Sequence, residues 1–76
     1  MQLGREHKSV YQAVAENYLM EAYFKSREFK WATLHGKRSI HFAKKLYPRG
    51  SPTRYWIIRA TENYLQNIEW VEIFGL

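Results

Sequence analysis

The chain contains no cysteine, and this absence limits how its 76 residues can fold. Neither a disulfide nor a thiolate metal site can stabilise the domain, so an apolar core must hold it together. Hydrophobic residues make up 46% of the sequence and aromatic residues 17%, which is far more than a disordered chain contains. A chain of this length supports one hydrophobic core, and we therefore expect a single domain over residues 1–76.

The absence of cysteine also favours a cytoplasmic protein, because small secreted domains commonly depend on disulfides. The first nine residues are mostly polar and charged, and they do not resemble a secretory signal peptide. No apolar run reaches the roughly 18 residues that a membrane span requires. The sequence therefore predicts a protein that has no membrane partner.

Positive charge is concentrated in the middle of the sequence. The net charge is +5 overall, but it is −1 over residues 1–24, +9 over residues 25–59 and −3 over residues 60–76. Such a block focuses a positive potential that attracts phosphate groups. We therefore expect a polyanion as the partner, and the alternative is a solvated basic face that serves solubility.

Three segments have the three- and four-residue apolar spacing of helices. The first covers residues 9–26, where Ser9 and Gln12 have the spacing of a capping box. The second covers residues 39–47, and the third starts at Ser51, a capping hydroxyl that is followed by proline. The apolar residues expected to face the core from the first segment are Val10, Tyr11, Val14, Ala15, Tyr18, Leu19 and Ala22.

Two further segments alternate between apolar and polar residues, as half-buried strands do. They cover residues 28–34 and residues 68–76, and His35 and Gly36 provide a break after the first. We expect the two strands to pair, which gives an α+β fold of three helices with a small two-stranded sheet. The alternative is a mostly helical fold of three helices.

Residues 40–65 resemble the helix-turn-helix of DNA-binding proteins. The resemblance depends on Ala43 in the first helix, on the turn at residues 48–51, and on Ile57, which can pack back on the first helix. With the flanking segments added, the order of elements is similar to that of a small winged helix. The resemblance implies that the helix starting at Ser51 reads DNA with its N-terminal part.

The candidate nucleic-acid-binding residues occur in this helix and just before it. Cations that precede the helix suit the sugar-phosphate backbone, and hydroxyls at its start suit a phosphate oxygen. Arg59 could make a two-pronged hydrogen bond to guanine, or a plain surface pair with Glu62 or Asn63. Tyr55 could stack on a base, although a place at the rim of the core is more common. The full set is Lys37, Arg38, Lys44, Lys45, Arg49, Ser51, Thr53, Arg54, Tyr55 and Arg59.

Residues for catalysis or metal binding are missing from the sequence. The spacing of His7, His35 and His41 matches no zinc pattern, and thiolate ligands are absent. All seven carboxylates are glutamates scattered along the chain, so neither a catalytic triad nor a carboxylate pair is credible. We expect no enzyme activity, no cofactor and no metal.

The sequence leaves two functions open. The leading hypothesis is a small nucleic-acid-binding protein, a DNA-binding transcriptional regulator or accessory factor that favours duplex DNA. Such a protein could form a homodimer through Trp70 to Leu76, because one small module buries little surface on DNA. The preferred alternative for this apolar segment is that it closes the core. The alternative is a phage-type protein inhibitor or adaptor, anti-CRISPR-like for example, that binds host nucleic-acid machinery through a basic and aromatic face.

Overall fold

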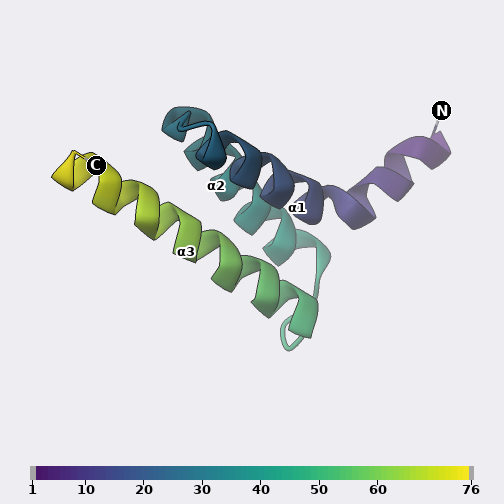
Figure 1. Ribbon diagram of the computed structural model, residues 1–76. Coiled ribbons are helices and arrows are strands. Elements are labelled where there is room, and N and C mark those ends of the chain that lie inside the picture. The colour runs from purple at the N-terminus through teal and green to yellow at the C-terminus, as the bar shows by residue number, and fades with distance from the viewer. Residues whose placement is uncertain (1, 76) are drawn as a thin grey trace.

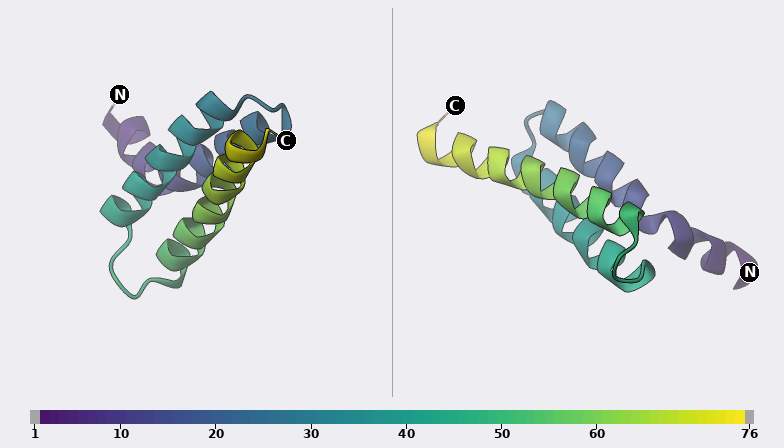
Figure 2. Two further views of the ribbon diagram at one scale, coloured as in Figure 1. Left: turned by 90° about the vertical axis from the view of Figure 1, so that its left-hand side faces the viewer. Right: turned by 90° about the horizontal axis from the view of Figure 1, so that it is seen from below.

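The computed structural model describes the backbone of residues 2–75 and the side chains of residues 11–75. It contains three helices, α1 over Gln2–Lys25, α2 over Phe29–Leu46 and α3 over Pro52–Phe74. α2 runs antiparallel to both neighbours and packs against each, whereas α1 and α3 contact each other less (Figure 1 and Figure 2). The Cα atoms span only 13 Å in the shortest direction and 44 Å in the longest, so the bundle is flat.

The prediction of an α+β fold with a two-stranded sheet is wrong. Residues 2–75 contain no strand, and the fold over this range is all-α. Residues 28–34, predicted as the first strand, contain the start of α2, and the expected break at His35 and Gly36 lies inside this helix. A seven-residue alternation is too short to outweigh a helical spacing that continues beyond it. That spacing is carried by the buried small residues Ala32, Gly36, Ser39 and Ala43.

The second predicted strand is also helical, since α3 continues through residues 68–74. Buried and half-buried side chains of α3 recur every three or four residues through this segment, which is the spacing of a helix face and not of a strand. They are Ile57, Thr61, Tyr64, Ile68 and Val71. The helix ends at Gly75, whose left-handed φ of 71° lets its N–H reach the Val71 carbonyl.

Of the three predicted helix starts, only that of α3 is confirmed. Ser51 Oγ accepts a hydrogen bond from the Arg54 N–H at 3.2 Å, and proline follows in the first turn. α1 begins at Gln2, seven residues before the predicted start. Ser39, the predicted start of the second helix, lies in the middle of α2 and is fully buried.

The core contains few large side chains, because α2 contributes small residues to it. Gly36 shows how close the helices come: a Cβ at this position would lie 2.9 Å from Leu65 Cδ2 and 3.0 Å from Met20 Sδ. The missing side chain therefore permits the approach of all three helices. Two buried clusters lie on either side of this point, one formed by Ala13, Ala43 and Ile57 and the other by Met20, Ala32 and Ile68.

A layer of buried polar side chains joins the three helices between these clusters. Asn17 Nδ2 in α1 donates to Thr61 Oγ1 in α3 at 2.9 Å. Thr61 Oγ1 lies 3.5 Å from Ser39 Oγ in α2, and Ser39 donates to the Ala13 carbonyl at 2.8 Å. All buried polar atoms of the described side chains have a partner. The layer thus fixes the relative positions of the helices without leaving an unsatisfied group.

This polar layer explains why the predicted core face of α1 is wrong. Tyr11, Tyr18 and Leu19 were expected inside but are 68%, 66% and 42% exposed. The helix is turned so that Glu16 and Asn17 are buried with Met20. A hydrophobicity pattern cannot reveal this orientation, because it counts polar residues as surface.

Replacing Thr61 with valine tests the polar layer. The change keeps the shape but removes the hydroxyl that accepts from Asn17, so a buried amide loses its partner. We expect the free energy of unfolding to fall by about 1–3 kcal/mol in urea titrations. In the double variant Thr61→Val with Asn17→Leu, the loss should be smaller than the sum of the two single losses. Additive losses would contradict the hydrogen bond.

Replacing Glu28 tests where α2 begins. Glu28 precedes the helix with φ −97° and ψ 75°, and its side chain makes no capping hydrogen bond. Because serine caps helices well, Glu28→Ser should raise the free energy of unfolding by about 0.5–2 kcal/mol. Glu28→Ala, which cannot cap, is the control, and equal thermal midpoints for the two variants would place the helix start elsewhere.

Candidate nucleic-acid interface

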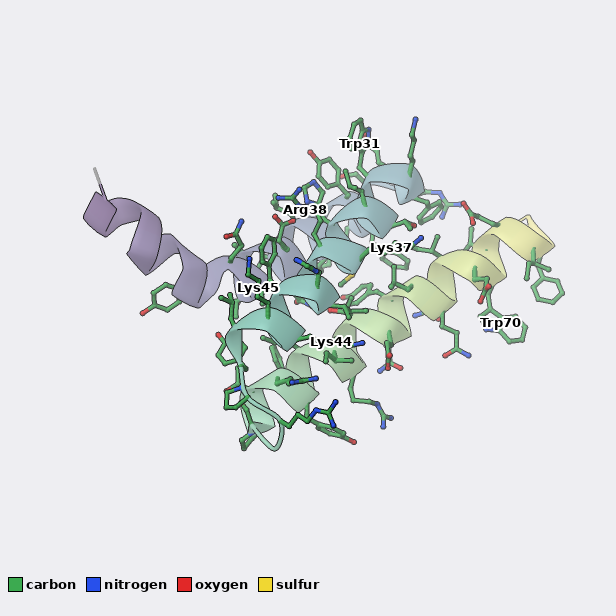
Figure 3. The ribbon with its side chains drawn as sticks, turned by 180° about the vertical axis from the view of Figure 1, so that it is seen from behind. Trp31, Lys37, Arg38, Lys44, Lys45 and Trp70 are labelled. Carbon is green, nitrogen blue, oxygen red and sulfur yellow. The ribbon has the colours of Figure 1, made fainter. Side chains whose placement is uncertain are left out.

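The outward face of α2 carries all five lysines and arginines of the helix. The fully buried residues of α2 are small, and Phe29 and Phe42 pack partly buried at the edges of the core. The lysines and Arg38 are exposed on the opposite side of the helix. These exposed cations come from both halves of the helix, and Figure 3 labels four of them, Lys37, Arg38, Lys44 and Lys45, along α2. The five are Lys30, Lys37, Arg38, Lys44 and Lys45, and we call this surface the basic face.

No carboxylate is present in Phe29–Leu46, so the basic face has no acidic residue of its own. One acid reaches it from α1: the buried Glu16 accepts from Arg38 Nε at 3.0 Å and lies 2.6 Å from His35 Nδ1. Arg38 is thereby held in place while its side chain stays 48% exposed. The four lysines of the face form no ion pair with the described side chains. Their charge is therefore available to a partner.

An acidic ridge on α3 borders the basic face on one side. Lys37 lines a shallow groove together with Glu62, Glu69 and Glu72. Lys37 and Lys44 lie toward this side, and Arg38 and Lys45 lie toward α1 (Figure 3). The positive surface thus has a definite edge along α3, and it continues toward the turn that joins α2 to α3.

A tight turn links the end of the basic face to α3. The Ser51 N–H donates to the Pro48 carbonyl at 3.1 Å, and Gly50 has a φ of 87°. This is the arrangement of a type II turn, in which glycine supplies the positive φ. The turn presents Arg49 to solvent directly after the last turn of α2.

Two further arginines follow in the first turns of α3. Arg54 Nη1 donates to the carbonyl of Tyr47 at 3.3 Å, which ties the start of α3 to the end of α2. Arg59 Nη1 donates to the Tyr55 hydroxyl at 3.1 Å, and its guanidinium carbon lies 5.7 Å from the centre of that ring. Both guanidinium groups are thus oriented by contacts within the protein.

These residues surround an open cleft of about 670 Å³. Its polar groups come from arginines and a serine, and its apolar walls come from proline, isoleucine and the tyrosine ring. Its lining holds no carboxylate and consists of Arg49, Gly50, Ser51, Pro52, Arg54, Tyr55, Ile58 and Arg59. We call this site the turn cleft.

The structure separates the predicted binding residues into two neighbouring groups. Five of them line the turn cleft: Arg49, Ser51, Arg54, Tyr55 and Arg59. Four lie on the basic face: Lys37, Arg38, Lys44 and Lys45. Thr53 is exposed but does not line the cleft. Arg59 donates to the Tyr55 hydroxyl, which is neither of the surface partners, Glu62 and Asn63, that the sequence suggested for it.

Sequence reasoning missed Lys30 and Trp31, since both fell in a predicted strand. Lys30 lies seven residues before Lys37, and Lys37 lies seven before Lys44, so all three share one side of α2. Trp31 is 46% exposed on the same helix. The seven-residue spacing of the lysines was the available signal.

The end of α3 exposes more large apolar side chains than a segment that only closes the core would. Trp70, Ile73 and Phe74 are 49%, 68% and 59% exposed, and the rings of Trp70 and Phe74 stack with centres 5.2 Å apart. The predicted homodimer contact over residues 70–76 stays a prediction, and its last residue, Leu76, lies outside the described residues.

No known family model, no curated protein and no solved structure matches the chain. Within the described part of the chain, no group of three or more potential metal ligands comes together. The described helices include none that combines the length and apolar character needed to span a bilayer.

Replacing Gly50 with alanine tests the turn that shapes the cleft. Nothing lies within 4 Å of a Cβ built at Gly50, so the only penalty is the positive φ. We expect Gly50→Ala to lower the free energy of unfolding by about 1 kcal/mol. Gly50→Asn should lose less, because asparagine tolerates this conformation. An alanine variant as stable as the parent in thermal melts would contradict the turn geometry.

Proposed function

We propose that this protein binds nucleic acid through phosphate contacts made by the basic face and the residues of the turn. The observation that carries the proposal is the composition of α2, which has five exposed cations and no carboxylate. Surface charge that served only solubility would ordinarily mix both signs on a helix. A single-sign face on which the four lysines form no ion pair with the described side chains is suited to a polyanion.

The spacing of the lysines suits an extended anionic backbone. Lys30, Lys37 and Lys44 are seven residues apart, so at a rise of 1.5 Å per residue they span about 21 Å along the helix. Lysine reaches phosphates as a flexible point charge, which requires no particular base sequence. The arrangement supports backbone contact along a strand and does not by itself supply base recognition.

The contribution of α3 differs from that implied by the helix-turn-helix resemblance. The two helices of that motif cross at about 90–120°. α2 and α3 instead pair antiparallel, from Ala43 against Ile57 near the turn to Ala32 against Ile68 at the far end. We propose that the start of α3 extends the basic surface and does not enter a DNA groove as a separate reading helix.

Salt dependence tests the phosphate contacts. If four to six cations meet phosphates, the affinity for duplex DNA should fall on the order of 10²- to 10³-fold between 50 and 200 mM salt. Fluorescence anisotropy with a labelled duplex of random sequence measures this slope. A flat response over the same range would contradict the proposal.

A pair of double variants locates the binding surface. Lys44→Ala with Lys45→Ala should weaken binding and reduce the salt slope by about two contacts, while the thermal midpoint changes little. The control is Lys25→Ala with Arg27→Asn, which removes the same charge at the opposite turn, where asparagine tolerates the φ of 62° at Arg27. Equal weakening by both pairs would mean that net charge, and not the basic face, governs binding.

A protein partner is the second candidate, and the exposed large apolar side chains favour it. They include aromatic residues on all three helices, which is typical of interface hot spots. They are Tyr11, Tyr18, Leu19, Trp31, Leu34, Tyr55, Trp56, Trp70, Ile73 and Phe74. A partner captured from nuclease-treated lysate, together with no binding to duplex at low salt, would favour the inhibitor or adaptor over the nucleic-acid-binding protein.

A further inference from the structure

The turn cleft combines two properties that rarely occur together on a solvated surface. Three arginines line it without a carboxylate, so it is cationic. Its walls include Pro52, Ile58 and the ring of Tyr55, so it also offers apolar contact. Its volume of about 670 Å³ falls within the range of small-molecule sites. A ligand that matches both properties has a negative group and a flat apolar group.

Arg54 and Arg59 are oriented by contacts within the protein, but each keeps N–H donors for a ligand. Arg54 uses Nη1 for the Tyr47 carbonyl, and Arg59 uses Nη1 for the Tyr55 hydroxyl. A guanidinium carries five N–H donors, so each keeps donors for a phosphate in the two-pronged geometry that arginine favours. Arg49 reaches the cleft from the turn and forms no ion pair with the described side chains. The first-turn N–H of Arg54 is capped by Ser51, so the anion site depends on side chains and not on the helix end.

Tyr55 provides the flat surface. Its side chain is 64% exposed although it lines the cleft, and the hydrogen bond from Arg59 restrains its ring. An exposed, restrained aromatic ring beside cations is the feature on which single-stranded bases stack. An inorganic anion would leave this ring and the apolar walls unused.

We propose that the turn cleft binds one nucleotide unit of a single strand, with the base against Tyr55 and the phosphate held by Arg49 and Arg54. The inference deepens the proposed function, on which it rests, by assigning a single-stranded end or loop to the cleft and the continuing phosphate backbone to the basic face. The base contact is sequence-tolerant, because every base has a π-face.

Titration with free small molecules tests the cleft separately from the basic face. Adenosine 5′-monophosphate, adenosine and inorganic phosphate are added to the ¹⁵N-labelled full chain at low salt, and backbone amide shifts are followed. We expect the nucleotide to bind at least tenfold more tightly than either fragment, with shifts concentrated in residues 48–59. Equal affinity for nucleotide and phosphate, or shifts spread along α2, would overturn the proposal.

Two matched tyrosine variants identify the stacking surface. Tyr55→Ala should weaken nucleotide binding about tenfold, the scale of one lost stacking contact. Tyr18→Ala removes a ring that is 66% exposed on α1 and should leave the affinity unchanged. Unchanged affinity in Tyr55→Ala, with a parental thermal midpoint, would overturn the assignment of the base.

The lysine variant distinguishes failure of the cleft from failure of the proposed function. Lys44→Ala with Lys45→Ala should keep mononucleotide binding and lose affinity for long strands. If the nucleotide binds in the cleft but no strand binds, the cleft remains a nucleotide site, whereas the proposed function and the assignment of a strand to the cleft fail. If strands bind with a steep salt slope but the nucleotide does not, the proposed function stands and the cleft assignment fails.

Discussion

The close approach of α2 to both other helices is the constraint on which the rest of the structure depends. It is possible because the buried side of α2 consists of Ala32, Gly36, Ser39 and Ala43. Larger residues of α2 such as Phe29 and Phe42 pack only at the edges of this buried stripe, and the side of the helix opposite to it faces solvent. That opposite side carries all five cations of α2, so the packing of the helix also determines where the basic face lies.

The polar layer adds specificity to a core that is poor in large side chains. Alanine, glycine and serine bury little apolar area each, so hydrophobic burial alone would hold the register of the helices weakly. Hydrogen bonds from Asn17 to Thr61 and from Ser39 to the Ala13 carbonyl select one alignment. Glu16 extends the layer to the surface, where it orients Arg38 at the edge of the basic face. Adjacent buried polar residues of α1, Glu16 and Asn17, thus serve the candidate interface and the core respectively.

How far the fold can be predicted from the sequence depends on which residues enter the core. The start of α3 is marked by a capping serine and a proline, and the C-terminal half of α2 has apolar helical spacing, so both were predicted correctly. The first half of α2 packs through Ala32 and Gly36, which carry almost no hydrophobic signal. The large aromatic residues that suggested strands, Trp31 and Trp70, lie instead on the surface.

The grouping of the candidate residues depends less on the predicted fold, because charge clustering along the sequence survives an error in secondary structure. Arg49, Arg54 and Arg59 are close along the chain and stay close under any local structure. The sequence does not show that these arginines form a group separate from the lysines of α2, because that separation depends on the antiparallel pairing of α2 and α3. The pairing of Arg59 with Tyr55 likewise follows only from the helical register of α3.

The central claim is that the lysines of α2 contact phosphates, and lysine footprinting tests it most directly. The chain is acetylated at limiting reagent with and without a saturating oligonucleotide at low salt, and the modification of each lysine is read by mass spectrometry. The account predicts protection of Lys30, Lys37, Lys44 and Lys45, with Lys25 on α1 modified equally in both samples. Protection of Lys25 to the same degree, or no protection on α2 under conditions where the oligonucleotide is bound, would contradict it.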